Sequence, residues 1–399
     1  MTRLDLDAAP LNTVASSARL PWSALLALAT GGFITILTEA LPAGVLVPMG
    51  KGLQVSSALV GQLVTFYALG SLLAAIPVVA MTRGWRRRPL LMLAVAGFAV
   101  SNIVTALSPV YYVTLLARFA AGVSAGILWS LLAGMASRMV TPELQGKAIA
   151  VAMLGTPLAL ALGLPAGAWL GAAVGWRWTF GIVSIMAALL LVWMRWAVAD
   201  MAAAPVAKRR SVFSVLARAG VRQVLLTLIL FVLAHNILYT YLEPLLQAAK
   251  IGKQLGAALL LFGGASLLGI WVAGTLVDRH LRQLVLLSTA LFLSAMLGLV
   301  VAGAIPWVVY VAVGVWGVAF GGSATLFQTA AAKAATDEAD AAQSMLVTAW
   351  NLAIAGGGLA GGIWLDWGGA STLPWLAVVL LVAGWYVAWN ARSHGFPAS

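Results

Sequence analysis

Charged residues are scarce in this sequence. Of 399 residues, 9% are charged and 62% are hydrophobic, and the mean hydropathy is +1.01. A soluble domain has about a quarter of its residues charged. The chain lacks the polar surface that a protein of this size needs to stay in water, which excludes a soluble protein.

Cysteine is absent, which excludes disulfides and thiolate metal sites and leaves the redox compartment open. The three histidines are not at metal-ligand spacing, so no metal site is expected. No phosphate-binding loop, nucleophile–base pair or metal-ligand cluster is present, so we expect neither an enzyme nor a cofactor. The net charge of +12 is spread thinly between apolar runs, without the basic, aromatic-interleaved patch of a nucleic-acid binder. The polar first 22 residues are not a signal peptide.

Long apolar runs are what the sequence has instead, and a helix needs about 20 such residues to cross a bilayer. The pattern predicts an all-α membrane protein with twelve transmembrane helices. We place them at 22–48, 58–81, 89–108, 110–138, 145–173, 176–199, 222–248, 255–277, 283–303, 306–332, 342–366 and 372–392.

The basic residues predict the orientation in the membrane. If the N-terminus is cytoplasmic, 18 of the 23 Lys and Arg residues face the cytoplasm. The opposite loops hold only four, and Arg118 lies inside a span. Because cytoplasmic loops carry the excess of Lys and Arg, both termini are predicted to be cytoplasmic. The expected location is the inner (cytoplasmic) membrane, crossed many times.

A polar, basic interval at about 200–221 divides the spans six and six. An internal repeat supports the division, since "RRPLLMLAVAGF" at 87–98 resembles "LRQLVLLSTALF" at 281–292. Two parallel six-helix halves are typical of transporters with a midplane site. The expected organisation is an N-terminal tail (1–21), a first half (22–199), a basic cytoplasmic linker (200–221), a second half (222–393) and a C-terminal tail (394–399).

Several motifs now resemble the major facilitator superfamily. The second-half turn "GTLVDRHLR" resembles the family's loop between spans two and three, through Asp278, Arg279 and Arg282. The first-half copy keeps Arg83 and Arg86 but has Thr82 near the place of the usual aspartate, which puts its charge relay in doubt. Span four carries the Arg-x-x-x-Gly pattern at Arg118. Span five resembles the motif of the family's antiporters, through Gly155, Pro157, Gly163, Pro165 and Gly167.

Three further stretches resemble the twelve-span drug:proton antiporter branch, near its sugar- and arabinose-efflux-like members. They are "TEALPAGVL" in span one, "AHNILYTYLEPLL" in span seven and "WNLAIAGGGLAGG" in span eleven. A departure is "SAGILWS" in span four, where relatives often carry a His-Ala pair. The resemblance implies an exporter that exchanges protons for small molecules such as drugs or sugars. It would work as a monomer in the bilayer, driven by the proton-motive force without a cofactor.

Glu39 and Arg118 are the predicted proton-coupling pair. A charge near the bilayer centre costs about 2.5–3.5 kcal/mol, so its presence there calls for a function. Glu39 lies eight residues before residue 47 and Arg118 eight after residue 110, which gives them matching depths, and the family fold makes their spans neighbours. Such a pair offsets its own burial cost, and a carboxylate balanced in this way can take up and release a proton. The alternative is that Glu39 reaches up to water at the outer end.

Span seven is the predicted substrate wall. It offers His235, Asn236, Tyr239 and Tyr241, although a lone membrane histidine is as often a satisfied core group. Glu243, near the outer end, is predicted as a gate residue rather than a second proton carrier. Two further cavity candidates lie on spans ten and eleven, namely Gln328 and Asn351.

The prediction is therefore a proton-coupled exporter that works by alternating access. A symporter or uniporter importing a sugar or nucleoside is the alternative within transport. A membrane sensor on the same fold, with no flux, is the alternative from another class. A passive channel is disfavoured, because the sequence shows no filter repeat or charge ring.

Overall fold

The computed structural model describes residues 19–75, 81–82, 84–202, 219–335 and 339–396, and within these ranges it is all helical, without a β-strand. The α-helices are α1 (Trp22–Gly44), α2 (Leu46–Leu53), α3 (Ser57–Ala75), α5 (Arg87–Leu107), α6 (Tyr111–Arg138), α7 (Gln145–Met153), α8 (Gly155–Leu158), α9 (Leu164–Ala173), α10 (Trp176–Ala197), α12 (Ala219–Thr240), α13 (Leu242–Ala248), α14 (Leu255–Ala302), α15 (Pro306–Gly321), α16 (Ser323–Ala335), α17 (Ala339–Gly368) and α18 (Leu373–Asn390). A π-helical turn, Ala159–Gly163, joins α8 to α9.

Helix α14 accounts for two of the predicted spans. Its 48 residues are more than twice what one crossing needs, and His280 inside it is non-helical (φ −129°, ψ 27°). The two parts meet the same turn of α15. A Cβ built on Gly269 would lie 2.2 Å from the Val318 carbonyl oxygen, and Ser288 Oγ donates a hydrogen bond to Ala319 O at 2.5 Å. The helix therefore folds back at His280, and the eleven long apolar helices of the described residues make twelve spans, as predicted.

The outer surface of the bundle is apolar, as a lipid-facing surface requires. Large apolar side chains are exposed on several helices, such as Leu116, Leu189 and Trp271. Exposure of this kind over many helices is unusual for a soluble monomer. In lipid a helix satisfies its own backbone groups, which explains why these runs form helices rather than open strands.

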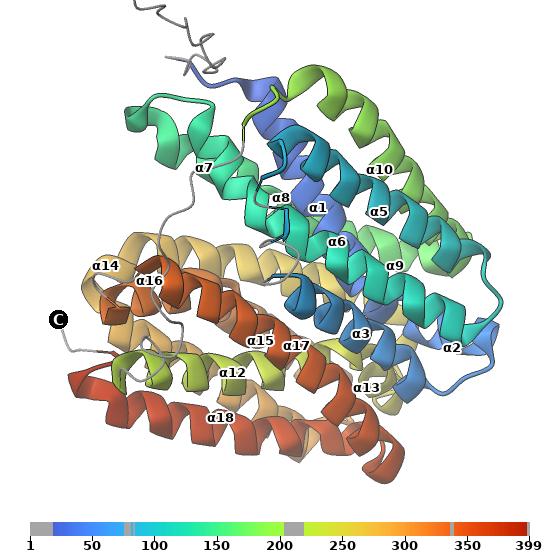
Figure 1. Cartoon of the computed structure of the whole chain (residues 1–399). Helices are drawn as coiled ribbons and strands as arrows, with labels where there is room; N and C mark the ends of the chain where they lie inside the picture. The colour runs from blue at the N-terminus through green and yellow to red at the C-terminus, as the bar shows by residue number, and fades with distance from the viewer. Residues whose placement is uncertain (1–18, 76–80, 83, 203–218, 336–338, 397–399) are drawn as a thin grey trace, which may run out of the picture.

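The helices form two groups, α1 to α10 and α12 to α18, drawn above and below in Figure 1. Glycine permits the closest crossings inside each group. A Cβ on Gly122 of α6 would lie 1.9 Å from Tyr67 O of α3, and one on Gly321 of α15 would lie 2.1 Å from Ser266 O of α14. Most of the predicted linker, 203–218, lies outside the described residues, so the domain boundaries stay a prediction.

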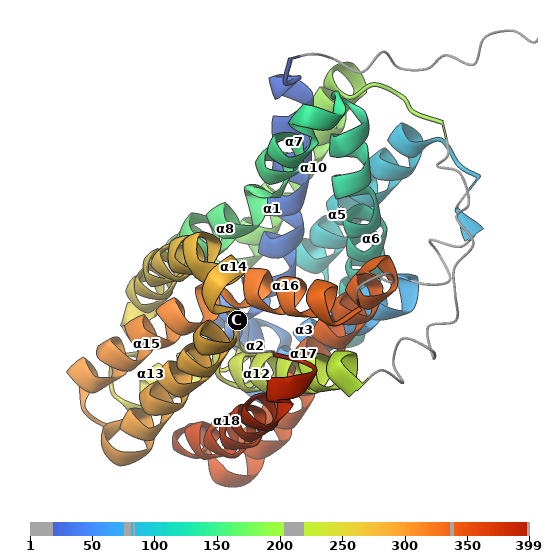
Figure 2. The ribbon, with the colours of Figure 1, turned by 90° about the vertical axis from the view of Figure 1, so that its left-hand side faces the viewer.

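The two groups meet through α3 against α17 and through α9 against α14, and Figure 2 shows them diverging from this contact. Polar contacts join them toward the end where α2 and α13 lie. Tyr241 Oη donates to Gly358 O at 2.6 Å, and Thr65 Oγ1 donates to Ala355 O at 3.2 Å. Gln62 Nε2 donates to the same Gly358 carbonyl at 3.3 Å. The structure is therefore closed at the α2/α13 end.

Helices α1 and α12 break at corresponding places. Val45 (φ −136°, ψ 28°) separates α1 from α2, and Tyr241 (φ −110°, ψ 27°) separates α12 from α13. A proline follows three residues later in each case, in the first turn of the short helix, where its missing N–H costs no hydrogen bond. The two breaks set the direction of α2 and α13, which meet at the closed end.

Candidate functional site

Arg118 projects from α6 onto α1 and is fully buried. Its Nη2 donates to the carbonyl oxygen of Thr38, with a longer contact of 3.3 Å to the carbonyl of Glu39. Pro42 lies inside α1, four residues after Thr38, and has no N–H to complete the helical bond to that carbonyl. Arg118 therefore supplies the hydrogen-bond donor that the Pro42 nitrogen lacks.

Glu39 is half-buried on α1 beside this contact. We expected an ion pair between its carboxylate and Arg118, and the structure differs. The guanidinium reaches the backbone of Glu39 instead of its carboxylate, and within the described residues a side-chain ion pair forms only between Arg86 and Asp200. The matching depth of the two residues is present, but the helix carbonyls take the arginine. The proton-coupling role stays a prediction.

A buried polar cluster surrounds Arg118. Tyr67 places its ring 4.9 Å from the guanidinium carbon and donates its hydroxyl to Thr35 O at 3.0 Å. Asn102 Nδ2 donates to Thr38 Oγ1 at 3.0 Å. Arg118 Nε and Nη1 and Asn102 Oδ1 have no hydrogen-bond partner. Sequence reasoning missed Asn102 and Tyr67, although polar residues at the depth of Glu39 in otherwise apolar runs were a usable signal.

His235 of α12 lies in an aromatic cluster. Its ring stacks on Phe320 at 3.5 Å between centroids and on Tyr239 at 5.0 Å, and it meets Trp316 edge-on at 5.3 Å. Phe262 of α14 packs 4.9 Å from Trp316. The structure therefore joins two predicted residues, His235 and Tyr239, to three aromatic rings that the sequence reading did not single out.

The other predicted cavity residues are placed differently. Asn236 and Asn351 are buried, and each donates its side-chain amide to the carbonyl four residues earlier in its own helix. Tyr241 is fully buried between the two groups of helices. Gln328 is exposed on α16, and its backbone carbonyl accepts a hydrogen bond from Gln343. The structure thus brings Gln328 toward a neighbouring helix rather than into the aromatic cluster.

Glu243 joins α13 to α2 at the closed end. Its Oε2 accepts a hydrogen bond from the backbone N–H of Val47 at 2.8 Å, and its side chain is only 8% exposed. Val47 is the second residue of α2, a helix that has no side-chain cap of its own. A carboxylate at the N-terminal end of a helix both pairs a free N–H and complements the helix dipole. Glu243 therefore caps α2 from the other half of the molecule.

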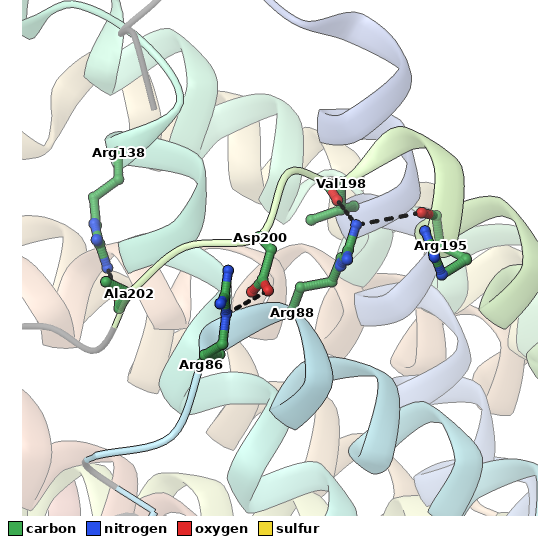
Figure 3. A network of polar contacts seen from close by, with 7 residues as sticks. All are labelled: Arg86, Arg88, Arg138, Arg195, Val198, Asp200 and Ala202. Atoms are coloured by element: carbon green, nitrogen blue, oxygen red, sulfur yellow. Dashed lines mark hydrogen bonds and ion pairs between the residues drawn. The ribbon is translucent and has the colours of Figure 1, made fainter. Parts of the chain in front are cut away.

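The basic loop before α5 has an acidic partner that the sequence motifs do not predict. Arg86 Nε lies 2.6 Å from Asp200 Oδ2, and Arg138 Nη1 donates to Ala202 O at 3.0 Å (Figure 3). Thr82 stands near the place where the resembled motif has its aspartate. In this half the carboxylate comes instead from the segment after α10. In the sequence, the only indication of this partner was Asp200, a single acidic residue at the start of the basic interval 200–221.

Arg88 and Arg282, which occupy the same position in the internal repeat, make the same contact. Arg88 Nη1 donates to Arg195 O at 3.5 Å and to Val198 O at 3.4 Å, at the end of α10 (Figure 3). Arg282 donates to Ala388 O at 3.1 Å, at the end of α18. Each arginine thus ties the third helix of its half to the sixth, which gives the repeat a structural meaning.

Of the remaining predicted gate residues in these loops, the structure describes Asp278 and Arg279. Arg83 lies outside the described residues. Asp278 is exposed, and its carbonyl accepts a hydrogen bond from Lys333 Nζ at 3.3 Å. Arg279 is exposed as well. Their gating roles stay predictions.

The glycine-rich fifth span packs mainly against α1. A Cβ on Gly155 would lie 1.9 Å from Ala29 O, one on Gly163 2.9 Å from the Phe33 ring and one on Gly167 2.7 Å from Leu41. Pro157 and Pro165 lie in the same segment, in α8 and at the start of α9. The motif thus lets this segment approach the helix that carries Glu39.

Comparison with known proteins supports this arrangement. A profile of the Major Facilitator Superfamily matches residues 28–358. The Transcription regulatory protein OpdE of Pseudomonas aeruginosa is 29% identical over 98% of this chain and 99% of its own. A probable sugar efflux transporter of Mannheimia succiniciproducens is 29% identical over 91% and 92%. The chloramphenicol efflux pump MT0201 of Mycobacterium tuberculosis is 31% identical over 89% and 90%.

The fold is also found among solved structures. The crystal structure of a D-xylose-proton symporter superposes with a TM-score of 0.76, at 15% sequence identity, over 93% of this chain and 98% of that one. At this identity the similarity concerns the fold alone. It agrees with the all-helical architecture of the described residues and with the family profile, and the resemblance drawn from the motifs is confirmed.

Proposed function

Since this chain belongs to the Major Facilitator Superfamily, a family of membrane transporters rather than enzymes, we propose that it exports small molecules such as drugs or sugars in exchange for protons. Relatives named as sugar and chloramphenicol efflux proteins match nine-tenths of the chain and support the direction of transport. The observation that carries proton coupling is the placement of Glu39, an acidic residue within a membrane-spanning helix, beside the fully buried Arg118. The protein would act in the inner membrane, driven by the proton-motive force.

Glu39 is the proposed proton carrier. Arg118 has two nitrogens, Nε and Nη1, without partners. A deprotonated Glu39 carboxylate that turned toward them would gain charge-assisted hydrogen bonds, and a protonated one would gain less. Protonation would thereby bias the position of α1, which is the differential interaction that coupling requires.

Alternating access is the proposed mechanism. The structure is closed at the α2/α13 end, where Tyr241, Glu243 and Thr65 join the two halves. If the termini are cytoplasmic, this closed end is the outer one and substrate would enter from the cytoplasm. Opening it must break these contacts, so they are the proposed outer gate. The proposed monomer would bind its substrate against α12, which packs on α1.

Everted membrane vesicles provide the test. Vesicles acidified by respiration and loaded with a pH-sensitive dye are challenged with chloramphenicol, L-arabinose and other neutral compounds, with Glu39→Gln vesicles as the matched control. We expect dye recovery on adding a substrate to the wild type and no recovery in the variant. Recovery of equal size in both would refute Glu39 as the carrier. Uptake into intact cells that follows an inward proton gradient would favour the symporter alternative.

A second candidate function has one specific observation in its favour. The relative that matches 98% of this chain is named a transcription regulatory protein, which agrees with a sensor that retains the fold. Proteoliposomes separate the two. Proton-driven flux of any panel compound, lost on Glu39→Gln, supports the exporter. Absence of flux from protein that still binds a compound, with altered transcript levels in a deletion strain, supports the sensor.

A further inference from the structure

A crevice lies in the lipid-facing surface of the second half, between α18 and the part of α14 that follows His280. Its volume is about 310 Å³, and its walls are Ala290, Leu293, Ser294, Leu297 and Trp385. Three of these side chains, those of Ala290, Ser294 and Leu297, are exposed. The Ser294 hydroxyl donates to Leu291 O in its own helix at 2.8 Å, so it is already satisfied. The crevice is therefore an apolar space that opens toward the bilayer.

A line of side chains connects this crevice to the end of the bundle. Trp385 stacks on Trp389, one turn further along α18, at 5.0 Å between ring centroids. The guanidinium carbon of Arg282 lies 5.7 Å from the centroid of the Trp389 ring. Arg282 precedes Ala290 by eight residues of α14, about 12 Å at 1.5 Å per residue. Half of a hydrocarbon core of about 30 Å is slightly more than this, so an acyl chain below a headgroup at Arg282 reaches the crevice.

The end of the bundle beside Arg282 carries positive charge. Arg282 donates to the backbone carbonyls of Ala388, Trp389 and Phe396, which are neutral acceptors and leave its charge in place. Arg392 is exposed and close enough to repel Arg282 electrostatically. The stretches 278–282 and 390–396 contain three arginines and a single acidic residue, Asp278. An external anion can therefore compensate the net charge at this end.

The corresponding end of the first half differs in charge. Arg88 holds the end of α10 there, as Arg282 holds the end of α18. The segment after α10 brings Asp200, whose carboxylate lies 2.6 Å from Arg86. The segment after α18 brings Arg392 instead, and residues 390–399 include no acid. The repeat thus places a carboxylate at one end and an additional cation at the other.

We propose that the groove from Arg282 and Arg392 to the crevice binds one anionic phospholipid, with its phosphate at the two arginines and an acyl chain in the crevice. The two cations favour an anionic headgroup over a zwitterionic one, because basic residues at a membrane surface attract anionic lipids. The apolar walls favour the chain. Trp389, between the two, offers an amphipathic ring at the level of the headgroup. The inference goes beyond the proposed export and does not depend on the compound transported.

Native mass spectrometry of the purified full chain, released from detergent micelles, tests the proposal. The probes are dioleoylphosphatidylglycerol, which is anionic, and dioleoylphosphatidylethanolamine, which is zwitterionic and has the same chains. Excess inorganic phosphate distinguishes a lipid site from a site for a free anion. Arg392→Gln removes an exposed charge, and Ala290→Phe fills the crevice without changing the charge. Arg195→Gln is the matched control, because Arg195 is the exposed arginine near the end of α10 in the first half.

We expect the wild type to retain phosphatidylglycerol about tenfold or more over phosphatidylethanolamine. Arg392→Gln should reduce this preference by about fivefold, the effect of one basic residue near an anionic surface. Arg195→Gln should keep the preference. Ala290→Phe should weaken both lipids by a similar factor and leave their ratio unchanged, because it removes space for the chain that they share.

Three results would overturn the proposal. The first is an unchanged preference in Arg392→Gln, or an equal loss in Arg195→Gln, since retention would then follow the total charge of the protein. The second is displacement of phosphatidylglycerol by inorganic phosphate, which would indicate an anion site without a chain. The third is unchanged binding of both lipids in Ala290→Phe. Arg392→Lys keeps the charge and should retain the preference, which separates loss of charge from loss of local structure.

Discussion

The contact between Arg118 and the break in α1 gives a quantitative prediction. Pro42 leaves the Thr38 carbonyl without its helical donor, and Arg118 supplies one. Changing Pro42 to Ala restores the N–H, so Thr38 O can be satisfied inside α1. The arginine then loses its main acceptor. The stability cost of Arg118→Met should therefore depend on which residue occupies position 42.

The magnitude follows from the contacts. In the wild type Arg118→Met removes a hydrogen bond from a charged donor, worth about 1.5–3 kcal/mol, and a cation–π contact with Tyr67, worth about 0.5–2 kcal/mol. Relief of a buried charge opposes these losses. In the Pro42→Ala background the first contribution disappears, because the carbonyl keeps a partner. We expect a coupling free energy of about 1.5 kcal/mol or more, within the usual range for residues in contact.

Unfolding in mixed SDS–detergent micelles, with four proteins in the cycle, measures this coupling. A second cycle pairs Arg118→Met with Pro157→Ala, which changes a helical proline in α8 on the fifth span. That control cycle should be additive within about 0.5 kcal/mol. The same cost of Arg118→Met in the wild-type and Pro42→Ala backgrounds would show that the arginine does not act on the carbonyl that the proline exposes.

Three other outcomes are expected. Glu243→Ala should lose the cap on α2, worth about 1.5–3 kcal/mol, and open the closed end. Spin labels at Lys51→Cys and Ala248→Cys in this cysteine-free chain should move apart, while the exposed Asp366→Asn leaves their distance unchanged. Unchanged distances in Glu243→Ala would contradict a latch. A reporter fused within 205–212 should be cytoplasmic and one at 51–55 periplasmic, and the reverse result would overturn the orientation. Glu39→Gln should abolish proton-driven export while substrate exchange without a gradient survives, and full export would move the proton carrier elsewhere.

The apolar pattern predicted most of the fold. Runs of about 20 apolar residues have one way to satisfy their backbone in lipid, so length and composition locate the spans. The same pattern placed a break between 277 and 283, and the chain indeed reverses at His280, although no loop interrupts the helix there. A single non-helical residue leaves almost no trace in composition, which is why the ends of these two spans could not be read from sequence.

The sequence predicted how deep in the membrane the candidate residues lie, but not which groups they contact. Residue counting along a helix fixes the height of Glu39 and Arg118 to within a turn. It does not fix which acceptor a long side chain selects, and here the carbonyl exposed by Pro42 competes with the carboxylate. The aromatic partners of His235 were harder still, because Trp316 and Phe262 come from other helices. Their meeting depends on crossing positions set by glycines such as Gly321.

The contact between Val47 and Glu243 at the closed end shows what the internal repeat contributes. Val45 and Tyr241 are the corresponding breaks in α1 and α12, which makes Val47 and Glu243 corresponding positions, each followed by a proline. Positions that are equivalent by the repeat belong to different halves of the molecule. A contact between them therefore joins the two halves. If both positions carried Glu, two carboxylates would face each other and repel. Because the first half has Val47, a second carboxylate is lacking there, and the Val47 N–H donates to the single carboxylate of Glu243. The asymmetry of one residue therefore places a single hydrogen bond at a symmetric meeting point.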